Sequence, residues 1–295
     1  MTLMKKTEQT EAEFLKNYDP AAYERPSVTV DMVIFTITNR PQENYRKLAK
    51  RELKVLLVKR GGHPFKGHWA LPGGFVRMSE SLDEAAAREL SEETGVNNVY
   101  MEQLYTWGDL ERDPRTRVIS CSYMALVDST HLDLQAGDDA DDAKWFTIAK
   151  TLTKENKTIS KTGSLHKQRS TLSLENDDVS IQSQLEKTIK TNGKNRIETE
   201  RILDFGGLAF DHARMISYAL DRLQNKAEYT DIVFHLMPEL FTLTQLQQVY
   251  ETILGCELLK ANFRRKIEDK VIETPHYAES AGHRPSKLFK MKREE

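Results

Sequence analysis

The chain has 295 residues, a formal net charge of −2, 30% charged residues and 39% hydrophobic residues. This composition is typical of a soluble globular protein, and the length predicts one large or, in our interpretation, two domains. Cys121 and Cys256 lie far apart, which argues against a disulfide framework, and no run approaches the roughly 20 apolar residues of a membrane span. We therefore expect a cytoplasmic protein with no signal peptide and no membrane partner.

The first 150 residues carry short apolar runs around one strong helical pattern. Residues 7–17 have a polar helical pattern, and residues 18–23 form a turn-rich lead-in. β-Branched and apolar residues predict strands at 28–38, 53–58, 98–107 and 118–127, and Trp145-Phe146 closes this portion. Strands around a helix predict an α+β fold in which helices pack on a mixed sheet.

A glycine-rich loop at residues 71–74 leads into the strongly predicted helix. Ser81 and Glu84 fit a capping box at its start, and Gly95 suits a left-handed residue just past its end. The expected buried stripe consists of residues that recur every four positions, namely Leu82, Ala86 and Leu90.

Three carboxylates crowd the other face of this helix. Glu89, Glu92 and Glu93 are spaced i, i+3 and i+4, and like charges at this spacing cost about 0.2–0.5 kcal/mol per pair. They also lie in the last turn, where the helix dipole disfavours anions. A hard divalent cation, most simply Mg²⁺ with Mn²⁺ as an alternative, would compensate both penalties. A solvated acidic face is the alternative interpretation.

Residues 151–206 separate the two halves of the chain. The part near 152–168 is rich in Lys, Ser and Thr, and we predict that it is mobile. Leu172 and Leu174 can lie in one strand, and residues 179–189 alternate partly with period two. Asn192-Gly193 is a strong hairpin signal, with a return strand at 196–203. We predict an inserted β-meander of about three strands.

From Phe210 onward the pattern is helical. We expect a helix lined by Ala213, Ile216, Leu220 and Leu223, a short helix at 231–237, and a helix that starts at a Thr244–Gln247 capping box and ends at Gly255. Another helix follows, lined by Leu259, Phe263 and Ile267, and then two strands at 271–274 and 287–291. Two helices joined by a glycine turn and followed by a hairpin predict a winged helix-turn-helix.

Charge is unevenly divided within this region. Residues 206–259 hold three Lys/Arg and seven Asp/Glu, a net −4, whereas residues 260–295 hold ten and six, a net +4. The positive charge therefore lies on the second helix and the wing, where phosphates of double-stranded DNA would lie. The predicted DNA contacts are Arg264, Arg265 and Lys266 on the helix and Arg284 in the wing. A protein-binding module with solvated arginines is the alternative.

Two family resemblances follow from these residues. The glycine-to-valine stretch resembles the Nudix box, whose fixed positions are filled by Gly74, Glu80, Arg88, Glu89, Leu90, Glu92, Glu93, Gly95 and Val96. Residues 18–148 resemble the Nudix domain of the ADP-ribose pyrophosphatase type through Tyr18-Asp-Pro, Val28-Thr-Val-Asp31, Trp69-Ala-Leu-Pro-Gly-Gly-Phe75 and Arg112-Asp-Pro-Arg115 with Arg117. Residues 207–295 look like the winged helix of the NrtR-type regulators through Leu208-Ala-Phe-Asp-His212, Phe241-Thr-Leu243, Asn262-Phe-Arg-Arg-Lys266 and Gly282-His-Arg-Pro285.

The resemblance implies an architecture and a set of partners. We expect a lead-in at 1–24, a Nudix α/β/α sandwich at 25–150, a linker and β-hairpin insert at 151–206, and a winged-helix domain at 207–295. Such a chain would bind ADP-ribose, another nucleotide sugar or a dinucleotide, together with operator DNA, as a homodimer. Its insert is longer than the short link usual in that family.

The resemblance also implies roles for the box residues. Glu89, Glu92 and Glu93 would hold the metals near the Gly73 carbonyl, Glu80 would act through the metal's water shell, and Arg88 would orient a glutamate. The general base is either a box glutamate or a carboxylate of the acidic loop at 137–142, for which a solvated turn is the alternative.

Substrate contacts are predicted from side-chain chemistry. Arg112, Arg115 and Arg117 can meet a diphosphate, because arginine forks match phosphate geometry, although surface salt bridges are the alternative. An aromatic side chain can stack on adenine, and the candidates are Phe65, Trp69 and Trp107, although core packing is the alternative.

Two functions remain open. The first is a Mg²⁺-dependent hydrolase that cleaves the pyrophosphate of ADP-ribose or a related compound. The second is an ADP-ribose-sensing transcriptional regulator of NAD metabolism with little or no hydrolysis. Many NrtR-type repressors have lost box residues, but none is missing here.

Overall fold

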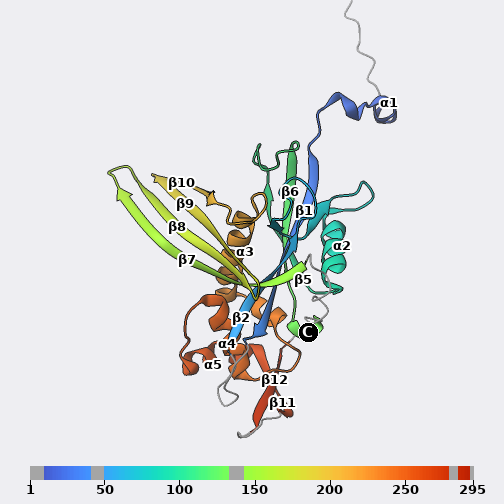
Figure 1. The fold of residues 1–295 in the computed structure, drawn as a ribbon. Coiled ribbons are helices and arrows are strands. Elements are labelled where there is room, and N and C mark those ends of the chain that lie inside the picture. Colours follow the sequence, from blue (N-terminus) through green and yellow to red (C-terminus); the bar gives the residue numbers. More distant parts are fainter. Residues whose placement is uncertain (1–9, 41–49, 133–142, 279–284, 293–295) are drawn as a thin grey trace, which may run out of the picture.

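The structure is a computed structural model that describes residues 10–40, 50–132, 143–278 and 285–292 (Figure 1). The helices are α1 (Glu11–Asn17), α2 (Leu82–Thr94), α3 (His212–Tyr229), α4 (Leu243–Leu254) and α5 (Lys260–Ile267), with a 3₁₀ helix η4 (Ile232–Leu236). The strands are β1 (Ser27–Asn39), β2 (Arg51–Lys59), β3 (Trp69–Ala70), β4 (Gly73–Phe75), β5 (Tyr100–Trp107), β6 (Val118–Leu126), β7 (Ala143–Ile159), β8 (Gly163–Asn176), β9 (Val179–Asn192), β10 (Asn195–Asp204), β11 (Val271–Ala278) and β12 (Ser286–Met291).

One ten-stranded sheet organises the molecule, with a main order of β10-β9-β8-β7-β2-β1-β6-β5. β1 pairs antiparallel with β2 and parallel with β6, which confirms the predicted mixed sheet. β3 pairs with β2, and β4 pairs with β1, so the loop before α2 is anchored to the sheet centre.

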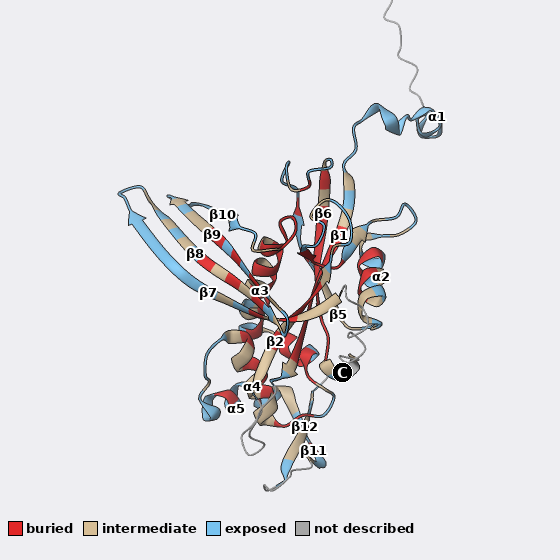
Figure 2. Cartoon of the chain, viewed as in Figure 1, coloured by how far each residue is buried: buried red, intermediate tan, exposed pale blue. Residues whose placement is uncertain are grey.

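Helices cover both faces of the sheet, because β1 is apolar on both sides. Met32 and Ile34 pack with Ala86 and Leu90 of α2 in one core. Val33, Phe35 and Ile37 pack in a second core with α3 and α4. Figure 2 shows buried residues along β1, β6 and α3, whereas the outer parts of β7 and β10 are mostly exposed.

The insert differs from its prediction. Four long antiparallel strands, β7 to β10, extend the Nudix sheet, and β7 runs across the predicted boundary at residue 150. The predicted mobility near 152–168 is wrong, because this segment pairs from β7 to β8 through registers such as Lys157 with His166. Thr- and Ser-rich strands can form with little burial when every backbone group is paired across the hairpin. The Asn192-Gly193 turn is confirmed, with a φ of 57° at Gly193.

The C-terminal region is a winged helix, as predicted. α4 ends at Gly255, which has a φ of 68°, and Tyr250 packs against Phe263 of α5 at 5.4 Å between ring centroids. The predicted cap of α4 is wrong by two residues: Thr242 and Gln245 form the capping box, because Leu243 is already helical. Within the described ranges, no helix is long and apolar enough to cross a membrane.

Candidate functional site

The box helix forms as its sequence predicts. Ser81 and Glu84 make both hydrogen bonds of the capping box, and Gly95 has a φ of 67°. Ala86 and Leu90 are buried, while Leu82 is partly buried against the same core. Glu89 is also buried, and a Cβ on Gly74 would lie 2.4 Å from its Oε1 atom. Glycine at position 74 therefore lets the loop approach the Glu89 carboxylate.

Arg88 lies among three box carboxylates. Its Nη2 and Nε atoms donate to Glu80 at 2.8 and 3.1 Å, and its Nη1 donates to Glu89 at 2.6 Å and to Glu92 at 3.3 Å. The Arg88 hydrogen bonds lower the pKa of Glu80 to about 2. One guanidinium thus provides part of the positive charge that we predicted from the sequence for this patch, and it keeps the Glu80 carboxylate ionised.

Glu93 differs from the other box glutamates. It is half-buried, and its pKa is raised mainly by this burial and further by the negative charges of Glu89 and Glu92. Among described residues it has no hydrogen-bond or ion-pair partner, so the Glu89–Glu93 patch retains uncompensated negative charge.

The donor set on this patch suits a hard cation, although the metal site is not preassembled. Three carboxylates and the Gly73 carbonyl offer only oxygen ligands, which Mg²⁺ prefers. In the described part of the chain, no three acidic, histidine or cysteine side chains converge closely enough to hold a metal. The metal-binding and catalytic roles of the box residues remain predictions.

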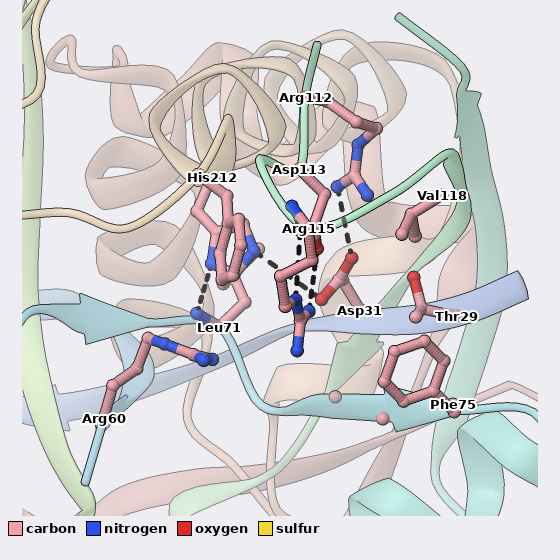
Figure 3. A pocket seen from close by; sticks show the side chains of 13 residues that line it. Thr29, Asp31, Arg60, Leu71, Phe75, Arg112, Asp113, Arg115, Val118 and His212 are labelled. Atoms are coloured by element: carbon pink, nitrogen blue, oxygen red, sulfur yellow. Dashed lines mark hydrogen bonds and ion pairs between the residues drawn. The ribbon is translucent and has the colours of Figure 1, made fainter. Parts of the chain in front are cut away.

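A cavity of about 150 Å³ lies beside the box loop (Figure 3). The predicted arginines Arg112 and Arg115 both line it. Its other lining residues come from the box loop, from β1, from neighbouring loops and from the segment that leads into α3; they are Thr29, Asp31, Arg60, Leu71, Gly73, Gly74, Phe75, Asp113, Val118, Phe210 and His212.

The two cavity arginines have different environments. Arg112 has a side chain that is only 4% exposed, and its Nη2 and Nε atoms donate to Asp211 at 2.8 and 3.1 Å. Its Nη2 also lies 3.6 Å from Asp31 Oδ2. Arg115 pairs with Asp113 at 2.7 Å but is 42% exposed. Arg115 is therefore the guanidinium better able to meet an incoming phosphate, whereas Arg112 is held in place.

Two other predicted substrate residues lie outside the cavity lining. Arg117 Nη1 donates to the carbonyls of Gly108 and Asp109 at 2.7 and 3.0 Å. Trp107 is 6% exposed, and its Nε1 donates to Ser122 Oγ at 2.8 Å. The structure thus does not bring these side chains to the cavity, and their contact with substrate remains a prediction.

The sequence analysis did not identify His212 as a cavity residue. Its Nδ1 accepts a hydrogen bond from the Leu71 backbone N–H at 2.8 Å, and burial lowers its pKa. The imidazole is therefore neutral at neutral pH, with its proton on Nε2, which lies 3.6 Å from Asp31 Oδ1. Asp31 also accepts a hydrogen bond from Ser120. His212 belongs to the motif at 208–212, but its role could not be predicted from the motif because its hydrogen-bond partner, Leu71, lies 141 residues away.

The candidate DNA interface is the exposed face of α5. Phe263 and Ile267 are buried, whereas Arg264, Arg265 and Lys266 are exposed. The predicted contact Arg284 and the acidic loop at 137–142 lie outside the described residues.

Comparisons with known proteins agree with this arrangement. Residues 45–165 match the NUDIX domain family, and residues 233–291 match the NrtR DNA-binding winged helix domain. The chain is 32% identical, over 95% of its length and 88% of the relative, to a protein of Acinetobacter baylyi named "ADPR responsive transcriptional repressor NtrR". It is 38% identical to an "ADP-ribose pyrophosphatase" of Methanocaldococcus jannaschii, over 45% of this chain and 68% of the relative. The structure of Shewanella oneidensis NrtR complexed with a 27mer DNA is similar, with a TM-score of 0.61 and 30% identity over 90% of this chain and 93% of that chain.

Proposed function

The chain belongs to the NrtR family, in which a Nudix domain is joined to a winged-helix DNA-binding domain, and we propose that it is an ADP-ribose-responsive transcriptional regulator. One observation carries the proposal. The cavity beside the box is lined both by the box loop, at Gly73 and Gly74, and by Phe210 and His212, which lead directly into α3. A ligand in this cavity would touch the Nudix domain and the entry to the DNA-binding region together.

The cavity chemistry supports a nucleoside diphosphate ligand. The exposed Arg115 guanidinium lies 5.6 Å from the Phe75 ring centroid and 5.9 Å from that of Phe210. Arginine binds phosphate in a bidentate manner, and an aromatic face beside it can stack on a nucleobase. The neutral His212 adds no charge, so the recognition of a diphosphate falls to Arg115 and Arg60.

Hydrolysis is a second candidate function, and the complete box favours it. Glu89, Glu92 and Glu93, with the Gly73 carbonyl, would hold Mg²⁺, which would supply charge neutralisation to a bound diphosphate. The chain's own contribution is position: Arg88 fixes Glu80, Glu89 and Glu92, and Gly74 keeps the loop against Glu89. Glu93 supplies a half-buried carboxylate without a described partner.

A homodimer is the third part of the proposal. Winged-helix regulators commonly read two half-sites through two-fold symmetry, and an isologous dimer of this chain would present two α5 helices. Arg264, Arg265 and Lys266 are the proposed phosphate contacts on each copy, with Arg284 in the wing.

One paired experiment tests these functions. The protein and its Glu93→Gln variant are incubated with ADP-ribose and Mg²⁺, while both are titrated against a duplex from the gene's own upstream region. We expect ADP-ribose to change DNA affinity in both proteins, because Glu93 lies outside the cavity lining. AMP release by the wild type alone would support hydrolysis. DNA binding that is unaffected by saturating ADP-ribose would rule out the regulator.

A further inference from the structure

We propose that residues 206–212 form a coupling segment, in which the Arg112–Asp211 ion pair transmits occupancy of the cavity to α3 and so to the winged helix. This inference rests on the proposed function, because it names the residues through which the same cavity regulates DNA binding. Four features of the segment support it: its pairing, its two side-chain anchors, its backbone conformation and the helix that follows it.

The backbone of the segment pairs with strand β3 of the Nudix domain. Trp69 N–H donates to the Gly207 carbonyl at 3.0 Å, and Ala209 N–H donates to the Trp69 carbonyl at 2.8 Å. Leu208, between them, forms a parallel bridge with Trp69 and is fully buried. Trp69 in β3 precedes the box loop by two residues, so the segment and the box loop are attached to each other at the backbone.

Two consecutive side chains then anchor the segment to different walls of the cavity. His212 accepts the Leu71 N–H at 2.8 Å, which fixes the box loop. Asp211 accepts both hydrogen bonds of the Arg112 fork, and Arg112 belongs to the loop between β5 and β6. The entry to α3 is thus held by residues that surround the cavity rather than by the winged helix itself.

The backbone of the segment is in a conformation that its neighbours must maintain. Gly206 and Gly207 have φ values of 60° and 105°, and a Cβ on Gly206 would lie 2.2 Å from the Gln182 carbonyl oxygen. Phe210 has a φ of 51°, which is rare and unfavourable for a residue with a side chain. Its ring packs on Phe65 at 4.8 Å and under the Arg60 guanidinium at 4.8 Å. A ligand that displaces Phe210 would release this strain.

We infer a second arrangement for the Arg112 guanidinium. In the structure it lies 2.8 Å from Asp211 and 3.6 Å from Asp31, and because Arg112 lines the cavity, a diphosphate bound there by Arg115 and Arg60 would also attract this guanidinium away from Asp211. A ligand shifts such an equilibrium only through contacts that differ between the two arrangements, and the loss of the Arg112–Asp211 pair is such a difference.

A change at the Arg112–Asp211 pair would act directly on helix α3. Asp211 is the N-cap residue of α3, and its carboxylate makes no capping hydrogen bond. α3 is 18 residues long, and its buried face shares one core with η4, α4 and the buried residues of α5. A displacement at residue 211 therefore moves the helix on which the winged helix packs.

The test compares two ion pairs that join the same loop to α3. Asp211→Asn removes the ion pair with Arg112 but keeps the size of the side chain, and Asp211 does not line the cavity. Asp109→Asn is the matched control, because Asp109 pairs with Arg214 of α3 at 2.5 Å and lies outside the cavity lining. Hydrogen exchange of α3 is measured with and without saturating ADP-ribose, and DNA affinity is measured in parallel.

In the wild type and in Asp109→Asn, we expect ADP-ribose to change exchange in α3 and to shift DNA affinity by about 5–150-fold, the usual range of allosteric coupling. In Asp211→Asn, ADP-ribose should bind within threefold of wild type, while both responses fall below about twofold. If Asp211→Asn does not fold, Asp211→Ser serves the same purpose, because it also removes the negative charge that pairs with Arg112.

Several results would overturn the proposal. An unchanged α3 exchange response in Asp211→Asn, or an equal loss in Asp109→Asn, would show that the Arg112–Asp211 pair does not transmit the signal. A wild type in which ADP-ribose binds and α3 responds, but DNA affinity does not change, would contradict the proposed function while supporting coupling to α3. A wild type that does not bind ADP-ribose would contradict both.

Discussion

Two sites in this protein place a single guanidinium among carboxylates, but they are assembled in opposite ways. In the box, Arg88 holds Glu80, Glu89 and Glu92, all within 13 positions of sequence. In the cavity, Arg112 holds Asp211, 99 residues away, and lies near Asp31 of β1. The Arg88 side chain is 17% exposed, whereas that of Arg112 is 4% exposed.

This difference in construction suits the two sites to different functions. A site made from one loop and one helix can keep its geometry whatever the rest of the chain does, which suits the binding of a metal and a diphosphate. A buried pair that joins two distant segments is sensitive to their relative position, which suits a regulator. The comparison predicts that substitutions at the Arg112–Asp211 pair affect stability and coupling, whereas those that disturb the Arg88 cluster and Glu89 affect the proposed hydrolysis.

The largest expected effect is on stability at the cavity. Arg112→Ala should lower the free energy of unfolding by about 3–5 kcal/mol, because it leaves Asp211 and Asp31 buried without their cation. Urea unfolding at neutral pH measures the loss. Arg117→Ala is the control, since Arg117 binds only carbonyls of its own loop among described residues. A loss for Arg112→Ala no larger than that for Arg117→Ala would show that the cavity pair is not a structural link.

The next effect should fall on hydrolysis at the box. A Cβ at Gly74 would lie 2.4 Å from Glu89 Oε1, so Gly74→Ala must displace this carboxylate or the loop. Misplacement by about 1 Å can cost about 10²-fold in rate, and we expect a loss of that order in kcat for AMP release. Gly61→Ala is matched to it, because nothing lies within 4 Å of a Cβ there. Equal rates in the two variants would contradict the assigned role of the Gly74–Glu89 approach.

The same comparison explains what could be predicted from the sequence. The box helix depends on residues near in sequence, so its caps, its buried Ala86 and Leu90 and its acidic patch followed from spacing. The burial of Glu89 could not be predicted from this spacing, because it depends on the close approach of the loop at Gly74. His212 and Asp211 were visible only as a motif, since their partners are 141 and 99 residues away. The β7–β8 hairpin was missed because backbone pairing, rather than an apolar pattern, forms it.

DNA affinity should respond to α5 and not to the box. Arg264→Gln with Arg265→Gln removes two exposed cations, and each lost phosphate contact lowers the slope of log K against log salt by about 0.9. We therefore expect a slope smaller by about 2, measured by fluorescence anisotropy at several salt concentrations. Arg196→Gln with Arg201→Gln, at two exposed positions of β10, serves as the charge-matched control and should leave the slope unchanged. A slope that falls equally in both would place the phosphate contacts elsewhere.

The smallest expected effect tests how local the box helix is. Ser81→Ala removes the hydroxyl that accepts the Glu84 N–H at 3.2 Å, and loss of such a cap costs about 1 kcal/mol. Thr242→Ala removes the equivalent cap of α4, with a hydrogen bond from Gln245 at 3.2 Å, and should cost a similar amount by thermal unfolding. The two variants should differ in consequence: Ser81→Ala should leave the ADP-ribose effect on DNA affinity unchanged, because no residue of α2 lines the cavity. A loss of coupling in Ser81→Ala would show that the box helix and the cavity act as one site, which is the opposite of what their construction implies.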